Sequence, residues 1–308
     1  MNTTWSSRVQ TAEMLYTSRS LRFSDAFAAL YRPALGLEEA RDILEIGCGP
    51  GALAQALARW YPAARVRGVD RDSGFIAFAR EKAPRIDFDE GDALALPYEA
   101  GRFDATISNT VSEHVEPAGF FAEQARVLKP GGACVVMAAR RGLRRLAPCV
   151  EEETPFEAAL WEKAGARVSE ADRQRGVGAY AMDEQALPRR MEACGFREVT
   201  STCVALSFTP DSADCPRETA LAIFEAGRRN DLDAADFLLN EAWDLVTPAE
   251  IAELKRLIDA RYDRRVALYE AGERQWDTTV ALTQIIRGVK PRSARQWGIG
   301  NGEWGMKV

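Results

Sequence analysis

Short, largely apolar runs alternate with amphipathic segments through the first half of the chain. The apolar runs have the length and composition of buried β-strands, and they lie at 41–47, 65–70, 86–93, 103–109 and 133–139. Helical spacing fills the intervals at 52–61, 74–83 and 117–128. Strands that alternate with helices through short connections predict a parallel sheet with helices on both faces.

The pattern changes after the fifth of these strands. Residues 140–182 are rich in charge and poor in strand signal. A helix ending at Gly195 is predicted over 183–196, and a further strand over 197–208.

The last third of the chain is predicted to be helical until its final strand. Residues 216–275 divide into about three helical segments, with breaks at 231–233 and at 247–248. A closing strand is predicted at 278–291, and the tryptophan- and glycine-rich tail that follows fits no element.

Helical spacing also marks the N-terminal region, at 8–35. Ser24 or Asp25 is placed to cap a second helix there, which we expect to stop before Pro33. Taken together, the elements predict an α/β fold. Its doubly wound sheet has about seven mostly parallel strands, with N-terminal helices and a helical insertion or cap.

Composition and charge limit the classes of function that the chain can have. The 308 residues are 46% hydrophobic and 28% charged, which is typical of a packed globular protein. The net charge of −6 argues against nucleic acid as a partner. We see no signal peptide and no apolar run long enough to span a membrane. The six cysteines are scattered and there is one histidine, so we expect no metal site and a cytoplasmic location.

A glycine-rich turn joins the first predicted strand to a helix. Gly47, Gly49 and Gly51 leave the backbone bare there, so a ligand can approach the free N–H groups of the helix. Asp70 ends the second strand, where a carboxylate can accept hydrogen bonds from a ribose diol. These features predict a nucleoside site. Since Gly47, Gly49 and Ala52 also match the dinucleotide fingerprint, they leave open an NAD-linked oxidoreductase.

Five segments in order resemble the motifs of the class I S-adenosylmethionine-dependent methyltransferases. They are "LEIGCGPG" at 44–51, "GVDRD" at 68–72, "GDALALPY" at 91–98, "FDATISN" at 103–109 and "HVEP" with "FFAEQARVLKPGG" at 114–132. The resemblance covers 43–137 and extends more weakly to 183–209 and 276–290. It implies a Rossmann-like core and S-adenosylmethionine as the cofactor.

The resemblance also implies which residues bind the cofactor. Glu45 would lie near the methionine amino group, Asp70 at the ribose and Asp92 at the adenine amino group. The full set implied is Glu45, Gly47, Cys48, Gly49, Gly51, Asp70, Arg71, Asp92, Ala93, Asn109, Thr110 and Val111.

Further polar residues allow both a functional and a structural interpretation. His114 could be a general base, or it could pack beside the cofactor. Tyr16, Arg19 and Arg22 could contact the substrate, because N-terminal helices of this family often close over the site, or they could form an exposed face. The arginines of 139–146 could bind an anion or face solvent.

The resemblance implies methyl transfer to an N, O, S or C atom of a small molecule. No proline-rich motif typical of nucleic-acid amino methylation follows the fourth strand. A non-catalytic cofactor-binding partner and an RNA or protein methyltransferase remain alternatives. The expected division is a cap at 1–42, core at 43–139, 183–209 and 276–292, a substrate lid at 140–182, a helical insertion at 210–275 and a tail at 293–308.

Overall fold

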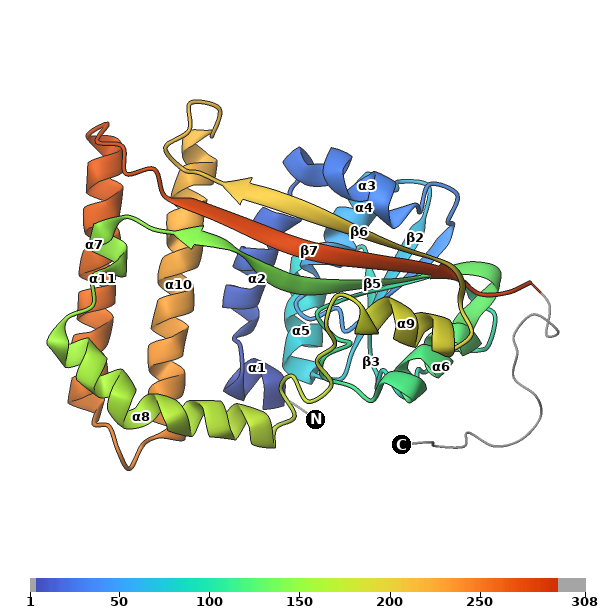
Figure 1. Ribbon diagram of the computed structural model, residues 1–308, viewed down its shortest axis with the longest axis horizontal. Helices are drawn as coiled ribbons and strands as arrows, with labels where there is room; N and C mark the ends of the chain where they lie inside the picture. Colours follow the sequence, from blue (N-terminus) through green and yellow to red (C-terminus); the bar gives the residue numbers. More distant parts are fainter. Residues whose placement is uncertain (1–3, 293–308) are drawn as a thin grey trace.

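A seven-stranded sheet organises the computed structural model, which describes residues 4–292 (Figure 1). The strand order is β3-β2-β1-β4-β5-β7-β6. The strands from β3 to β5 are parallel, and β7 runs antiparallel to both of its neighbours. The strands are β1 (Asp42–Ile46), β2 (Arg65–Asp70), β3 (Asp87–Glu90), β4 (Phe103–Asn109), β5 (Leu128–Arg145), β6 (Arg197–Phe208) and β7 (Thr278–Val289). The predicted doubly wound α/β sheet is confirmed.

Helices cover both faces of the sheet. Two apolar clusters lie between the helices and the strands: one contains side chains of α3, α4 and α5, and the other contains side chains of α6 and α9. These helices are α3 (Ala28–Leu35), α4 (Ala52–Trp60), α5 (Ser73–Lys82), α6 (Pro117–Val127) and α9 (Ala186–Ala193). We call this part, with β1 to β4, the core half.

A second region, which we call the helical half, has its own apolar cluster. Its helices are α7 (Pro148–Glu151), α8 (Pro155–Gln174), α10 (Arg217–Glu241) and α11 (Pro248–Glu270). The long strands β5, β6 and β7 run from the core half to this region, as Figure 1 shows. Between the halves lie α1 (Thr4–Arg8) and α2 (Ala12–Arg22). Within residues 4–292, no helix is long and apolar enough to cross a membrane.

Several predicted boundaries are confirmed. The strands β2, β4 and β6 have the predicted limits. Thr247 begins α11 with a capping box, in which its side chain accepts from the Glu250 N–H while Glu250 accepts from the Thr247 N–H. The predicted tail at 293–308 lies outside the described residues.

The prediction that strand structure stops near 139 is wrong. β5 continues to Arg145, because Arg140 pairs with Leu282 and Arg145 pairs with Thr278 on β7. Between these pairs the ladder has a bulge at Gly142, where a Cβ atom would lie 1.8 Å from the Val280 carbonyl oxygen. Pairing with a distant strand therefore outweighs the local polarity.

Two predicted helix breaks are also wrong. α10 continues through 231–233, because Asp231 accepts a hydrogen bond from Tyr262 and Asp233 accepts one from Thr11 instead of capping a new helix. A 3₁₀ turn (η1, Asp25–Phe27) precedes α3, and Ser24 makes no side-chain capping bond to it. α3 passes through Pro33 and ends at Gly36 in the left-handed region, because Tyr31 and Leu35 are buried on either side of the proline.

Candidate functional site

A cavity opens at the C-terminal ends of β1, β2 and β4. In an open parallel sheet this is where ligands bind, since the loops diverge there. Most of the residues predicted for cofactor binding line it together: Glu45, Gly47, Cys48, Gly49, Asp70, Arg71, Asp92, Ala93, Asn109, Thr110 and Val111. Arg19 and His114 line it as well, whereas Gly51, Tyr16 and Arg22 are not among its lining residues.

The glycines of the turn serve different purposes. All three have positive φ, at 67° for Gly47, 51° for Gly49 and 84° for Gly51. A Cβ atom on Gly47 would lie 2.3 Å from the Val111 side chain, and one on Gly51 would lie 2.9 Å from Phe88. At Gly49 the nearest atom would be 3.4 Å away. A Cβ atom on Gly49 would thus make only an ordinary contact with Leu15, so the positive φ is what favours glycine there. Gly51, in contrast, permits close packing against Phe88 and Ala79.

Asp70 is held by the backbone at the end of β2. Its Oδ2 accepts the Gly49 N–H at 2.8 Å, and its Oδ1 accepts the Asp72 N–H at 2.9 Å. Burial raises the pKa of this carboxyl group above its ordinary value. Each carboxylate oxygen retains a further lone pair, so the fixed group can still accept hydrogen bonds from a diol.

One part of the cavity wall contains an acidic side chain, Glu45, and a basic side chain, Arg19. Glu45 is 2% exposed and its Oε2 has no hydrogen-bond partner among the described residues. Burial, and then the nearby Asp70 charge, raise its pKa well above the ordinary value. Arg19 reaches in from α2 and donates to Thr110 Oγ1 at 2.9 Å. This combination matches the ammonium and carboxylate of an amino acid.

Asp92 and Ala93 line the cavity from the loop after β3. Asp92 Oδ1 accepts the Leu94 N–H at 2.9 Å, which forms a local turn and orients the carboxylate. The acidic positions Glu45, Asp70 and Asp92 thus come from three successive strand ends.

His114 is held in a neutral form. Its Nδ1 accepts the Gly178 N–H at 2.9 Å. Burial, and then the positive charge of Arg71, lower its pKa to about 4. In a neutral imidazole whose Nδ1 accepts, Nε2 carries the proton, so neither nitrogen is free to take another. This arrangement speaks against a general base and favours the alternative of packing beside the cavity.

The central part of this site matches a known family model. The model described as a methyltransferase domain matches residues 44–136. The chain carries a class I S-adenosylmethionine-dependent methyltransferase domain.

Individual relatives agree with this assignment. A probable S-adenosylmethionine-dependent methyltransferase of Mycolicibacterium smegmatis is 38% identical over 102 residues, which are 33% of this chain and 39% of the relative. A fatty-acid O-methyltransferase of the same organism is 41% identical over 98 residues, or 30% of this chain and 35% of the relative. The chain thus spans well under two thirds of the length of these relatives.

The chain is similar to a solved structure of Haemonchus contortus phosphoethanolamine N-methyltransferase 2. The matched region covers 87% of this chain and 53% of the chain in that structure. Its sequence identity is 17% and its TM-score is 0.48.

Helix α1 closes one side of the methyltransferase domain's cavity. The Trp5 ring lies 4.7 Å from the His114 ring, and Arg71 lies 5.7 Å from the centre of Trp5. The Ser6 N–H donates to Asp72 Oδ2 at 2.9 Å. Gly74 allows this approach, because a Cβ there would lie 2.4 Å from Ser6 Oγ. Helix α1 is therefore held in place by contacts with the loop after β2.

Sequence reasoning did not single out Trp5 or several other lining residues. Ile46, Pro50, Val69, Gly91 and Val115 lie within the family motifs but were not named as site residues, and Ala52 was named only as part of the dinucleotide fingerprint. The lining residues outside the motifs are Gln10, Leu15, Phe23, Leu53 and Phe75. Their spacing is that of ordinary core positions, so no local signal separates them from packing residues.

The other predicted substrate residues lie apart from the cavity. Tyr16 donates to Gln55 Oε1 on α4 at 3.2 Å, and its ring contacts Phe78. Arg22 lies one turn beyond Arg19 on α2, outside the lining.

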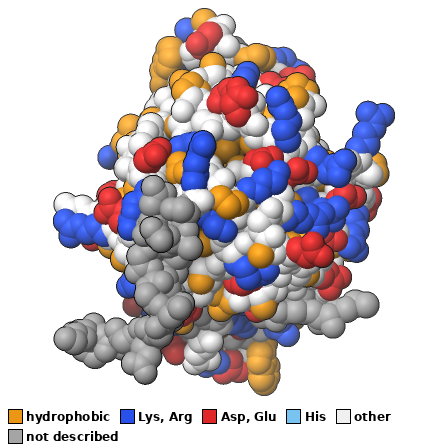
Figure 2. Space-filling view, turned by 90° about the vertical axis from the view of Figure 1, so that its right-hand side faces the viewer, with side chains coloured by type: hydrophobic (Ala, Val, Ile, Leu, Met, Phe, Trp, Pro, Cys, Tyr) orange, Lys and Arg blue, Asp and Glu red, His pale blue; other side chains and the backbone are white. Residues whose placement is uncertain are grey.

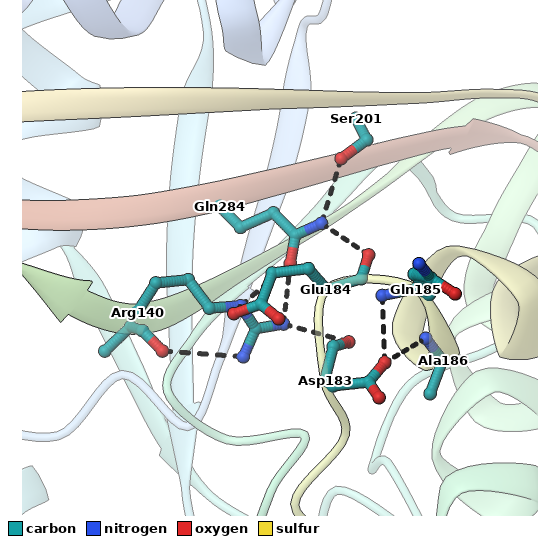
Figure 3. A network of polar contacts seen from close by, with 8 residues as sticks. Arg140, Asp183, Glu184, Gln185, Ala186, Ser201 and Gln284 are labelled. Atoms are coloured by element: carbon teal, nitrogen blue, oxygen red, sulfur yellow. Dashed lines mark hydrogen bonds and ion pairs between the residues drawn. The ribbon is translucent and has the colours of Figure 1, made fainter.

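Among the arginines of 139–146, Arg140 is oriented by Gln284, whose Oε1 accepts from Arg140 Nε at 2.8 Å (Figure 3).

Proposed function

We propose that this chain transfers a methyl group from S-adenosylmethionine to an N, O, S or C atom of a small-molecule acceptor. The observation that carries the proposal is the set of polar groups in the cavity. Asp92 suits the adenine amino group, Asp70 suits the ribose diol, and Glu45 with Arg19 suits the methionine ammonium and carboxylate. Asn109, Thr110 and Val111 complete the wall from the end of β4.

The residues present fit this cofactor. Glu45 Oε2 is a buried acceptor without a protein partner among the described residues, so an ammonium group would satisfy it. Gly49 lines the cavity without a side chain, so a ligand can approach the backbone there. When bound, S-adenosylmethionine supplies an already activated methyl group. The chain's own part is to hold both reactants, exclude water and orient them.

His114 contributes to closure in this proposal. Its Nδ1 bond to the Gly178 N–H holds the segment after α8 against the loop after β4. A second bond, from the Tyr180 N–H to the Glu113 carbonyl at 2.9 Å, holds the same two segments together. We therefore assign His114 a positioning role that keeps the cavity enclosed.

The helical half is proposed to form the acceptor lid. Its α10 is tied to the N-terminal helices, because Asp233 accepts from Thr11 and Glu241 lies 3.6 Å from Arg8. Glu241 also pairs with Arg175 at 2.7 Å, just after α8. The first two of these contacts join α10 to α1 and to the start of α2, the helices that carry the lining residues Trp5, Leu15 and Arg19.

A small acceptor is favoured over nucleic acid by charge. The chain has a net charge of −6. On the part of the face in Figure 2 that the described residues form, basic and acidic side chains are interspersed. The six cysteines are all free, which fits the reducing cytoplasm that we propose as its location.

Binding and turnover test the proposal separately. The melting temperature would be measured with S-adenosylhomocysteine, S-adenosylmethionine and NAD in turn. A ligand at about 100 times its dissociation constant should add roughly 2.7 kcal/mol of stability. Stabilisation by the first two and not by NAD supports the cofactor assignment, whereas stabilisation by NAD alone contradicts it.

Turnover would be followed as S-adenosylhomocysteine release with a panel of small acceptors. Cofactor binding without release on any acceptor would favour a non-catalytic partner.

A further inference from the structure

Two segments that lie beside the cavity meet at one glutamate of the helical half. Glu241 ends α10, and its side chain is 10% exposed. Its Oε2 accepts a hydrogen bond from Arg175 Nη2 at 2.7 Å, and its Oε1 lies 3.6 Å from Arg8 Nη1. Arg8 belongs to α1, whereas Arg175 begins the segment 175–180 that follows α8. One carboxylate therefore joins two segments that are far apart in the sequence.

The same two segments meet again at His114, on the loop after β4. The ring of Trp5 on α1 lies 4.7 Å from the His114 ring, and the Gly178 N–H donates to His114 Nδ1 at 2.9 Å. The contacts thus form a closed ring, which runs from His114 through α1 to Glu241 and returns through 175–180. Trp5 and His114 both line the cavity. If α1 moved away from His114, the cavity wall would open between them.

Neither segment is anchored by burial. Of the side chains described in α1 and in 175–180, none is fully buried, and Arg8 is 51% exposed. Gly176 and Gly178 have positive φ, at 79° and 70°, and a Cβ atom on either would meet no atom within 4 Å. Segments with little apolar burial open locally at a low cost in free energy. The polar contacts that hold these two segments therefore decide how often they open.

The position of Glu241 suits contacts between segments better than the stability of its own helix. It lies at the C-terminal end of α10, where the negative end of the helix dipole disfavours a carboxylate. Its Oε1 is buried and makes no hydrogen bond to a described residue, which is also unfavourable. Two arginines from other segments offset these effects, so the charge of Glu241 serves to hold those segments.

We propose that α1 and the segment 175–180 form a gate over the cavity, and that Glu241 is a positioning residue that holds both parts closed. Exchange of ligand then requires the contacts of Glu241 with Arg8 and Arg175 to separate. The inference rests on the proposed function for the identity of the ligand. It gives the helical half a part in cofactor exchange, in addition to its proposed part in covering the acceptor.

The first test compares binding rates with affinity. The full chain is immobilised, and surface plasmon resonance gives the association and dissociation rate constants of S-adenosylhomocysteine. Glu241→Gln keeps the size of the side chain and removes its charge, so it should raise both rate constants by roughly threefold or more. The dissociation constant should stay within twofold, because the same ion pairs are lost from the free and from the ligand-bound closed state.

A matched control lies on the same helix. Glu225 also contacts two arginines, Arg228 at 3.6 Å and Arg229 at 3.8 Å, but all three residues belong to α10. Glu225→Gln should therefore change neither rate constant. Arg8→Gln should give a smaller increase than Glu241→Gln, because it removes one of the two contacts. The melting curve of each variant confirms its fold.

A reversible cross-link tests α1 directly. A Cβ atom on Gly74 would lie 3.3 Å from the Cβ atom of Ser6, close to the spacing that a disulfide bond requires. In the double variant Ser6→Cys/Gly74→Cys, oxidation should hold α1 against the start of α5. S-adenosylhomocysteine should then associate at least tenfold more slowly than after reduction with dithiothreitol. Ser6→Cys alone is the control, and its association rate constant should not respond to the reductant.

Three outcomes would overturn the inference. Glu241→Gln could leave both rate constants unchanged, it could raise only the dissociation rate constant with a matching loss of affinity, or the oxidised double variant could bind as fast as the reduced one. In each of these cases the unaltered chain still binds S-adenosylhomocysteine and the proposed function survives. Failure of the unaltered chain to bind S-adenosylhomocysteine would instead overturn the proposed function together with this inference.

Discussion

The core half and the helical half differ in whether their buried charges form ion pairs. In the helical half, Arg265 is fully buried and pairs with Asp211 at 2.7 Å and Asp277 at 2.9 Å, although Arg265 Nη1 and Asp277 Oδ1 make no hydrogen bond to a described residue. In the core half, buried Glu45 has no ion-pair partner among the described residues and its Oε2 accepts no hydrogen bond from them, and Arg19, which reaches the same cavity from α2, has no carboxylate within ion-pair distance. Buried charges that are matched indicate structure, and those left unmatched around a cavity indicate a ligand.

The largest expected effect tests the helical half. Arg265→Ala should lower the free energy of unfolding by about 3–5 kcal/mol, because two carboxylates would remain buried without their cation. Urea denaturation followed by circular dichroism measures this. Arg256→Ala on the same helix is the control, since Arg256 pairs with Glu253 on the exposed surface and should matter little.

The same variant sharpens the comparison through ligand binding. If the halves differ as described, the folded Arg265→Ala protein should bind S-adenosylhomocysteine within twofold of the unaltered chain. A large loss of affinity would mean that the helical half holds the cavity in shape.

A smaller effect is expected in the core half, where Asp70 lines the cavity. Asp70→Ala should weaken cofactor binding at least tenfold, because each hydrogen bond to a charged group contributes about 1.5–3 kcal/mol. Calorimetry with S-adenosylhomocysteine measures this. Asp87→Ala is the control, since Asp87 is an exposed carboxylate on β3 that pairs with Arg67. Equal affinity in both variants would remove Asp70 from the site.

The smallest expected effect concerns His114, where the halves meet. Its pKa is lowered to about 4 in the folded protein, against an unfolded value of about 6.5, so between these values the unfolded chain binds more protons. The stabilisation is therefore complete above pH 6.5 and is lost as the pH falls towards 4. Allowing for partial exposure, we expect a loss of about 1–2 kcal/mol.

Denaturation at several pH values would check this. His114→Asn is the comparison, because its amide oxygen can accept the Gly178 N–H without titrating in this range. Equal losses of stability in both proteins would show that other groups cause the pH dependence.

The elements that the sequence predicts best are those whose partners are near in the chain. β2 and β4 have the predicted limits, and Asp70 and Asn109 at their ends line the cavity as expected. Their strands are buried and flanked by helices, so local composition carries the signal.

The features that sequence reasoning missed depend on distant contacts. The strand at 140–145 is paired by β7, and the partner of His114 Nδ1 is the N–H of Gly178, 64 positions away. Asp233 resembles a helix cap in the sequence but is bound by Thr11, 222 positions away. Trp5 lies outside every family motif, so its place over the cavity depends on how α1 packs. None of these partners can be read from a local window.

The position of β7 has a consequence for synthesis of the chain. β7 separates β5 from the edge strand β6, so neither can complete its pairing until β7 has been made. About 130 residues lie between the end of β5 at Arg145 and the start of β7 at Thr278. At roughly 5–20 residues per second, a ribosome needs on the order of ten seconds to translate them. During that interval a nascent chain exposes an open strand edge, the kind of surface that chaperones shield from neighbouring chains.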